Sequence, residues 1–259
     1  MTTTALAATA TLLAGAFAAA TFERWLDRRR RHELAWSVAL TFFALGAASL
    51  WAGAALGWDG PTFRLFYLFG AIVNVPALAL GTVYLLAGRR TGDVAAAGVG
   101  LLSAFAAGVL AVAPLTGPID PDALPQGSDV FGPLPRILAA VCSSVGALVV
   151  FGGAAWSAYR MLRGRAGPRG AATRRLALAN GVIAAGAATL SASGLLNSVA
   201  GAMNAFAITL TAGITLLFAG FLLATSPPTA PAPALVSLPT SARAEAPSRP
   251  DPVAARRRT

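Results

Sequence analysis

Few side chains in this sequence could take part in chemistry within an apolar environment, and these few are uncharged. All four asparagines lie in or beside long apolar segments: Asn74, Asn180, Asn197 and Asn204. An amide in hydrocarbon needs a hydrogen-bonding partner, so each of these side chains must face other helices or water. Pro76 follows Asn74 closely and lacks a backbone N–H, which predicts a kink in the helix that carries both residues.

Neighbouring residues extend these positions into a candidate polar cavity. At about 100° per residue, Tyr67 shares a helical face with Asn74, Asn180 shares one with Ser191, and Asn204 shares one with Thr211. The candidate residues are Tyr67, Asn74, Pro76, Asn180, Ser191, Asn204 and Thr211. Two interpretations stay open. The small and polar faces are packing surfaces between helices, or they line a cavity for a small solute around a kinked helix.

Other kinds of chemistry are excluded by the composition. All 20 basic residues are arginine, so a lysine Schiff base to retinal cannot form. His32 is the one histidine, which excludes bis-histidine haem ligation and a three-histidine metal site within one chain. The apolar segments carry no Asp or Glu away from their ends, which removes carboxylate relays and paired-carboxylate catalysis. We therefore expect no catalytic residue, no metal, no cofactor and no enzymatic activity. Cys142 is interpreted as a small buried hydrophobic residue.

Seven long apolar segments must position these side chains. The chain is 56% hydrophobic, with a mean hydropathy of +0.67. Each segment is long enough to cross a hydrocarbon core about 30 Å thick. We expect an all-α membrane protein whose transmembrane domain covers residues 1–225, with helices at about 4–22, 34–57, 62–88, 94–115, 134–160, 176–199 and 203–225. Residues 226–259 are rich in Pro, Ala and Ser, which predicts a disordered tail.

The arginines predict how these segments are oriented. If the seven segments cross in turn, 18 of the 20 arginines fall on one side, and only Arg64 and Arg136 fall on the other. This asymmetry is typical of the positive-inside rule. It predicts an N-terminus outside, a cytoplasmic C-terminus and a location in the plasma membrane, that is, the bacterial inner membrane.

Aromatic residues lie near the predicted segment borders, as in an interfacial belt. They are Trp25, Trp36, Tyr84, Trp156 and Tyr159 at inner ends, and Trp51, Trp58, Phe63 and Tyr67 at outer ends. The longest outer connection, residues 116–132, contains several Pro and Asp residues. That composition fits an ordered cap as well as a flexible linker.

Two similarities bear on the architecture. Residues 29–37 and 173–180 enter segments two and six in the same orientation with similar sequences, and parallel repeats of this kind would give a three-plus-one-plus-three arrangement. The stretch from Phe66 to Leu86, which contains Asn74-Val75-Pro76, resembles a segment of uncharacterised actinobacterial seven-helix integral membrane proteins. The resemblance implies a source and a membrane location, and it implies no functional residue. Length and segment count are also similar to those of sugar carriers, whose diagnostic motifs are absent.

Two functions remain as hypotheses. The first is a non-enzymatic membrane component that binds protein or lipid through its basic inner face, with anionic lipid headgroups as one partner and a protein at the Arg160–Arg175 loop as another. The alternative is a small-solute carrier. The net charge of +10 does not indicate nucleic acid. The charges are instead divided between the two sides of the membrane. The predicted inner side carries 18 arginines and six acidic residues, and the predicted outer side carries two arginines and four acidic residues.

Overall fold

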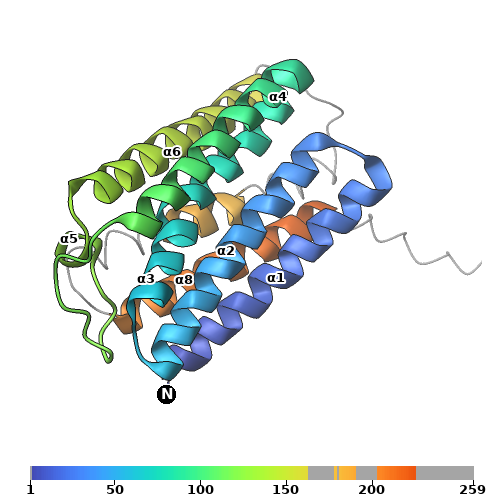
Figure 1. Ribbon diagram of the computed structural model, residues 1–259. Helices are drawn as coiled ribbons and strands as arrows, with labels where there is room; N and C mark the ends of the chain where they lie inside the picture. Colours follow the sequence, from blue (N-terminus) through green and yellow to red (C-terminus); the bar gives the residue numbers. More distant parts are fainter. Residues whose placement is uncertain (1, 163–177, 180, 191–202, 226–259) are drawn as a thin grey trace, which may run out of the picture. The chain divides into compact units, whose positions relative to one another are not determined.

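The computed structural model is all-helical over the residues that it describes, which are 2–162, 178–179, 181–190 and 203–225. Five helical stretches in this part of the chain are long and apolar enough to cross a membrane. Gly181–Leu190 is a shorter apolar helix. The elements shown in Figure 1 are α1 (Thr2–Arg28), α2 (Arg31–Leu56), α3 (Gly60–Phe66), the π-helix η1 (Tyr67–Val73), α4 (Asn74–Val112), α5 (Gly127–Val130), α6 (Pro133–Leu162) and α8 (Met203–Thr225).

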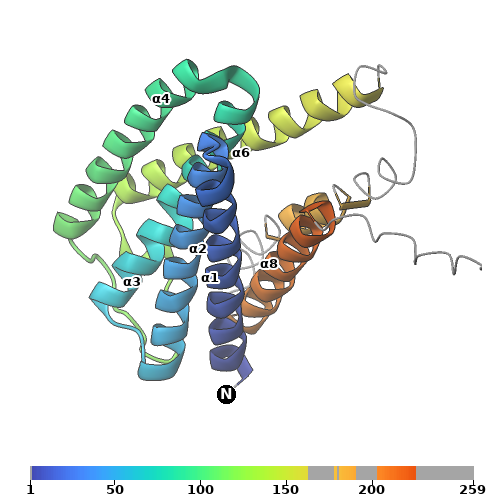
Figure 2. The same cartoon turned by 90° about the vertical axis from the view of Figure 1, so that its right-hand side faces the viewer.

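The longest helical stretch, Gly60–Val112, is folded back on itself at Gly88. Gly88 has φ +82°, in the left-handed region that glycine adopts without steric cost. A Cβ placed on Gly92 would lie only 2.1 Å from the ring of Tyr84, whereas residues eight apart on a straight helix are separated by about 12 Å. The arms before and after Gly88 therefore run antiparallel (Figure 2).

This reversal also corrects the expected boundary between the third and fourth segments. The expected helices at about 62–88 and 94–115 left residues 89–93 as a connection, but the chain reverses at Gly88 and is helical again at once. The difference arises because a single glycine with positive φ is sufficient for the reversal. The charged residues after it remain helical, since the end of a helix can extend beyond an apolar layer. In the same way, α1 continues to Arg28, past the expected end near residue 22.

Small residues set how closely the helices approach. In the described part, α1 packs against α2 and α8, α2 against α4, and α4 against α6. The contact face of α1 contains Ala7, Ala10 and Ala14, none of which has exposed surface. Hydroxyl groups bond across the interface, as when Ser37 of α2 donates to the Ala18 carbonyl of α1 at 3.0 Å. Alanine faces with such bonds are typical of close helix packing in membranes.

Residues 116–132 form an ordered cap, one of the two alternatives left open by the sequence. The backbone N–H of Thr116 donates to the Val130 carbonyl at 2.9 Å, and that of Trp58 donates to Pro121 at 3.0 Å. Phe131 at the end of the cap is 1% exposed and stacks on Phe63, with ring centroids 5.3 Å apart. The cap thus closes one end of the bundle over a cluster of aromatic rings.

The interpretation of Trp58 and Phe63 as interfacial belt residues is therefore wrong. Their side chains are 3% and 1% exposed, because the cap covers the end of the bundle where they lie. Each ring packs edge-on or stacked against others of the cluster, which also includes Phe66. By contrast, Trp51 is 46% exposed and Trp156 is 56% exposed, so a belt role for these two stays a prediction.

The capped end also accounts for Arg64, one of the two arginines on the minority side. Its guanidinium donates to the Leu110 carbonyl and, at 2.7 Å, to the Ala113 carbonyl. These carbonyls belong to the last turn of α4 and to the residue that follows it, where a helix leaves its acceptors without partners. A cation at a helix C-terminus also interacts favourably with the helix dipole. Arg64 therefore joins the two arms of the Gly60–Val112 stretch.

The first arm begins with a capped helix. Asp59 precedes α3, and its carboxylate accepts a hydrogen bond from the Thr62 backbone N–H at 2.8 Å. Pro61 occupies the first turn, where its missing N–H costs nothing. Hydrogen bonds from the Thr62 hydroxyl and backbone hold the pKa of the Asp59 carboxyl below its ordinary value. Asp59 is thus an anionic N-cap that fixes the start of the arm.

The irregularity expected at Pro76 lies one turn earlier than the sequence indicated. Residues Tyr67–Val73 form a π-helix, and α4 then continues through Pro76 from a regular Asn74 with φ −61°. In a π-helix each carbonyl accepts a hydrogen bond from the N–H five residues later in the chain, whereas in an α-helix the donor is four residues later. A carbonyl of the π-helix therefore does not depend on the N–H that a proline four residues later would lack. The expectation of a kink at Pro76 itself is therefore corrected to a widened helix before it.

Candidate functional site

Four of the residues expected to line a polar cavity come from the last two apolar segments. Asn180 and Ser191 lie outside the described residues, and so does the side chain of Asn204. Thr211 is described. Its hydroxyl lies 3.0 Å from the Leu6 carbonyl of α1 and 2.8 Å from the carbonyl one turn earlier in α8. A hydroxyl that bonds backbone carbonyls across helices is a packing contact, so Thr211 fits the packing interpretation.

The other three residues of the expected cavity follow one another along η1 and α4. The Tyr67 ring packs against Phe63 and Phe131, with centroids 5.8 and 5.0 Å away, and belongs to the aromatic cluster under the cap. Asn74 is half-buried and Pro76 is buried. The structure thus brings Tyr67 to one end of the bundle and leaves Asn74 and Pro76 deeper in it.

The π-helix between them is held by close contacts on two sides. From α2, Gly46 approaches so closely that a Cβ on it would lie 3.1 Å from the backbone nitrogen of Gly70. From α6, the Ser143 hydroxyl donates to the Ala71 carbonyl at 2.7 Å. A side-chain donor of this kind satisfies a carbonyl of the irregular backbone, as such segments require in an apolar environment. The sequence patterns did not indicate either contact.

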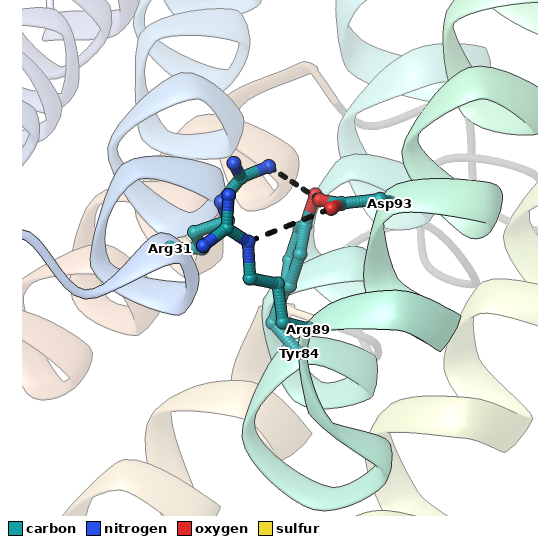
Figure 3. A network of polar contacts seen from close by, with 4 residues as sticks. All are labelled: Arg31, Tyr84, Arg89 and Asp93. Atoms are coloured by element: carbon teal, nitrogen blue, oxygen red, sulfur yellow. Dashed lines mark hydrogen bonds and ion pairs between the residues drawn. The ribbon is translucent and has the colours of Figure 1, made fainter.

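A second polar constellation lies at the opposite end of the bundle, where the Gly88 reversal meets the start of α2. Asp93 accepts hydrogen bonds from the Arg31 guanidinium and, at 2.8 Å, from the Tyr84 hydroxyl. Arg89 forms an ion pair with the same carboxylate at 3.8 Å. Figure 3 shows these four side chains converging from α2 and from both arms that flank Gly88. The network therefore fastens α2 to the reversal.

Sequence reasoning treated Arg31, Arg89 and Asp93 only as parts of charged connections and Tyr84 only as an interfacial aromatic residue. One signal was present in the sequence, because Asp93 follows Arg89 at a spacing of four, which places the two side chains on one helical face. The contact between Asp93 and Arg31 had no signal in the sequence, because 62 residues separate them.

A buried ion pair lies close to this end, between α1 and α2. Glu33 is 3% exposed and accepts from Arg24 at 3.5 Å. Among the described residues, the second carboxylate oxygen of Glu33 and the Nε of Arg24 have no hydrogen-bonding partner. The Arg24 guanidinium also lies over the Phe221 ring of α8, 5.2 Å from its centroid. Arg24 thus links three helices.

The α1–α2 connection is a tight turn built from arginines. Arg29 has φ +51°, which non-glycine residues seldom adopt, and its guanidinium lies 4.9 Å from the centroid of the Trp25 ring. Beside the turn is a hollow of about 300 Å³ that reaches the Gly88 reversal. It is lined by Arg29, Arg30, Arg31, His32, Tyr84 and Arg89. Four of its six lining residues are arginines, so the hollow is a candidate site for anions.

In the described part of the chain, no group of three or more His, Cys, Asp or Glu residues is placed to hold a metal ion. Cys142 is buried and free. Fold and site together define an all-helical protein whose long apolar helices are compatible with membrane insertion, and in its described part four arginines line one hollow at the end of the bundle. Comparison with protein-family models, with curated proteins and with solved structures found no match.

Proposed function

We propose that the chain is a seven-helix, non-enzymatic component of the bacterial plasma membrane whose basic cytoplasmic end contacts anionic lipid headgroups. The reversal at Gly88 supports the count of seven, because it divides one 53-residue stretch into two antiparallel arms. The distribution of arginines supports an N-terminus outside and a C-terminus inside. Most of the Arg160–Arg175 loop, proposed as a protein contact, lies outside the described residues.

The observation that carries the lipid proposal is the arginine-lined hollow at the end of the bundle. Basic pockets between helices on the cytoplasmic side of a membrane are suited to lipid headgroups. The hollow lies where α2 begins and where the Gly60–Val112 stretch reverses. In a bilayer with the proposed orientation, this position is at the level of the inner headgroups.

Reconstitution into bilayers of defined charge tests the proposal. The full chain is expected to have a higher midpoint of thermal unfolding in nanodiscs that contain phosphatidylglycerol than in nanodiscs of phosphatidylcholine alone. The difference should shrink as salt is raised, because the Debye length falls from about 10 Å at 0.1 M to about 3 Å at 1 M. Equal midpoints in the two bilayers at low salt would contradict the proposal.

A small-solute carrier is the second candidate, and η1 is the observation that favours it. Single-turn π-helical irregularities are frequent at functional sites, and interrupted helices near the midplane form the binding sites of many carriers. Here η1 leads directly into Asn74 and Pro76. Against this candidate, the contacts of Gly46 and Ser143 with η1 are those of a packed interface.

Thiol labelling at position 74 separates the two candidates. Because Asn74 is half-buried and its neighbour Val75 lies in close contact with Gly146 of α6, we expect Asn74→Cys in a Cys142→Ser background to resist a membrane-impermeant maleimide in intact cells and in inverted vesicles. Asp122→Cys, in the exposed part of the cap, is the positive control and should react in intact cells. Reaction at position 74 from either side would show that water reaches the middle of the bundle, and it would favour the carrier.

A further inference from the structure

We propose that the hollow lined by Arg29, Arg30, Arg31, His32, Tyr84 and Arg89 binds the phosphate group of a single anionic phospholipid headgroup. The proposal rests on the proposed function and names the site and the ligand chemistry within it. General attraction between a basic surface and an anionic leaflet requires no particular site. Here the geometry points to one.

The balance of charge in the hollow favours an anion. Four guanidinium groups line it, and Asp93 supplies one carboxylate to two of them, which leaves a formal excess of three positive charges. The cation–π contact of Arg29 occupies the face of its guanidinium and leaves the N–H groups at its edge able to donate. Arginine forms paired, charge-assisted hydrogen bonds with phosphate, so the lining has the donors that a phosphate group needs.

The start of α2 adds to this positive field. Arg30 is the N-cap residue, without a capping side-chain bond, and Arg31 is the first residue of the helix. Cations are unfavourable at a helix N-terminus, because the helix dipole is positive there. An anion in the hollow would interact favourably with the dipole and with both arginines, which removes the conflict. A bound anion would therefore offset the unfavourable placement of these two arginines at the start of α2.

The backbone at Arg29 gives an independent reason. A left-handed backbone conformation is unfavourable for an L-residue with a Cβ, and glycine would adopt it without that cost. The turn instead has arginine at φ +51°. Arginine at this position supplies one of the four guanidinium groups of the hollow. An anionic ligand that binds the Arg29 guanidinium accounts for an arginine at this position, whereas a simple reversal of the chain does not.

The surroundings of the hollow point to a lipid as the source of the phosphate group. Its volume of about 300 Å³ is at the lower end of the range for small-molecule sites, which suits a headgroup. Leu26 is 45% exposed, Leu85 52% and Leu86 41%, and these residues precede the lining arginines by a few positions in each helix. Exposed apolar side chains within about one helical turn in sequence of the lining arginines can contact acyl chains, which inorganic phosphate lacks.

Short-chain lipids test the site on the intact chain in uncharged detergent. The probes are dioctanoyl phosphatidylglycerol, dioctanoyl phosphatidylcholine and inorganic phosphate, and the readout is the midpoint of thermal unfolding at increasing probe concentration. Phosphatidylglycerol should raise the midpoint of the unaltered chain. In the double variant Arg30→Gln, Arg89→Gln, which removes two of the four guanidinium groups, the half-saturating concentration should rise by at least about tenfold, because the loss of a single charge-assisted bond already has about that effect.

Two further variants make the result specific. Arg136→Gln removes one arginine charge from an exposed residue of α6, outside the hollow, and should respond like the unaltered chain. Asp93→Asn removes the carboxylate that engages Arg31 and Arg89, and should lower the half-saturating concentration severalfold. The second variant keeps the test decisive if the double variant does not fold.

Each contrary outcome has a distinct meaning. If phosphatidylglycerol acts equally on the unaltered chain and on the double and Asp93→Asn variants, the hollow is not the site, while the proposed function stands. If phosphatidylglycerol and phosphatidylcholine have the same effect on the unaltered chain, the preference for anionic headgroups fails as well. If inorganic phosphate gives the same variant-dependent shift at similar concentration, a soluble anion is the ligand and the lipid assignment is overturned.

Discussion

Replacing Arg64 with Gln is expected to lower the free energy of unfolding by about 2–3 kcal/mol, because the guanidinium bonds two carbonyls at the end of α4. Gln cannot supply the charge that interacts with the helix C-terminus. The residue is half-buried and its bonds join positions 46 and 49 residues apart. The substitution therefore separates the two arms of the Gly60–Val112 stretch at their capped end.

The effect should appear as a fall of about 5–10 °C in the midpoint of thermal unfolding in detergent, given the usual sensitivity of chains of this size. Arg136→Gln is the matched control, because it removes an arginine from an exposed position and should change the midpoint little. A midpoint that is equally insensitive to both substitutions would show that the Arg64 bonds contribute nothing to stability.

Arg64 also shows what the sequence reveals and what it does not. Counting arginines on each side marked this residue as an exception, and the apolar runs predicted long helices. Both are local properties of the chain. The carbonyls that Arg64 bonds were beyond prediction, because no pattern relates a residue to partners more than 40 positions away. The same limit hid the contact between Arg31 and Asp93.

The aromatic residues show that position near a segment end does not predict the burial of two side chains of the same type. Trp51 and Trp58 both lie near a predicted segment end, but one is 46% exposed and the other 3%. The difference comes from the cap, whose Pro121 accepts a hydrogen bond from the Trp58 backbone. The composition of residues 116–132 left order and flexibility equally open. The burial of side chains at this end of the bundle therefore depends on a loop whose order could not be predicted from its composition.

For the candidate sites, periodicity indicated which residues share a face but not which helix that face meets. Thr211 was placed on a polar face, and the structure directs it to the backbone of α1. An irregular helix was expected at Pro76, because a proline's missing donor is readable from sequence, and the structure has a widened helix directly before Asn74 and Pro76. The hollow brings together two turns about 60 residues apart, and neither turn alone indicated it.

Gly146→Leu is expected to disrupt the packing of α6 against α4. A Cβ at this position would lie 2.9 Å from the Val75 carbonyl carbon and 3.0 Å from its oxygen. The obstacle is backbone, which cannot rotate away as a side chain would, so the two helices must separate. Overpacking of this kind costs about 1–3 kcal/mol and occasionally more. Because the contact adjoins Asn74 and Pro76, the loss should extend to the π-helix that Ser143 also holds.

The same helix offers a control that isolates packing from helix propensity. Gly152 also lies in α6, is exposed, and has no atom within 4 Å of a Cβ placed on it. Gly152→Leu should therefore leave the unfolding midpoint unchanged or raise it, since leucine favours a helix by up to about 1 kcal/mol over glycine. Gly146→Leu should lower the midpoint by about 2–12 °C, at roughly 2–4 °C per kcal/mol. Equal midpoints for the two variants would mean that α6 does not pack against α4 through Gly146, and that the π-helix lacks this support.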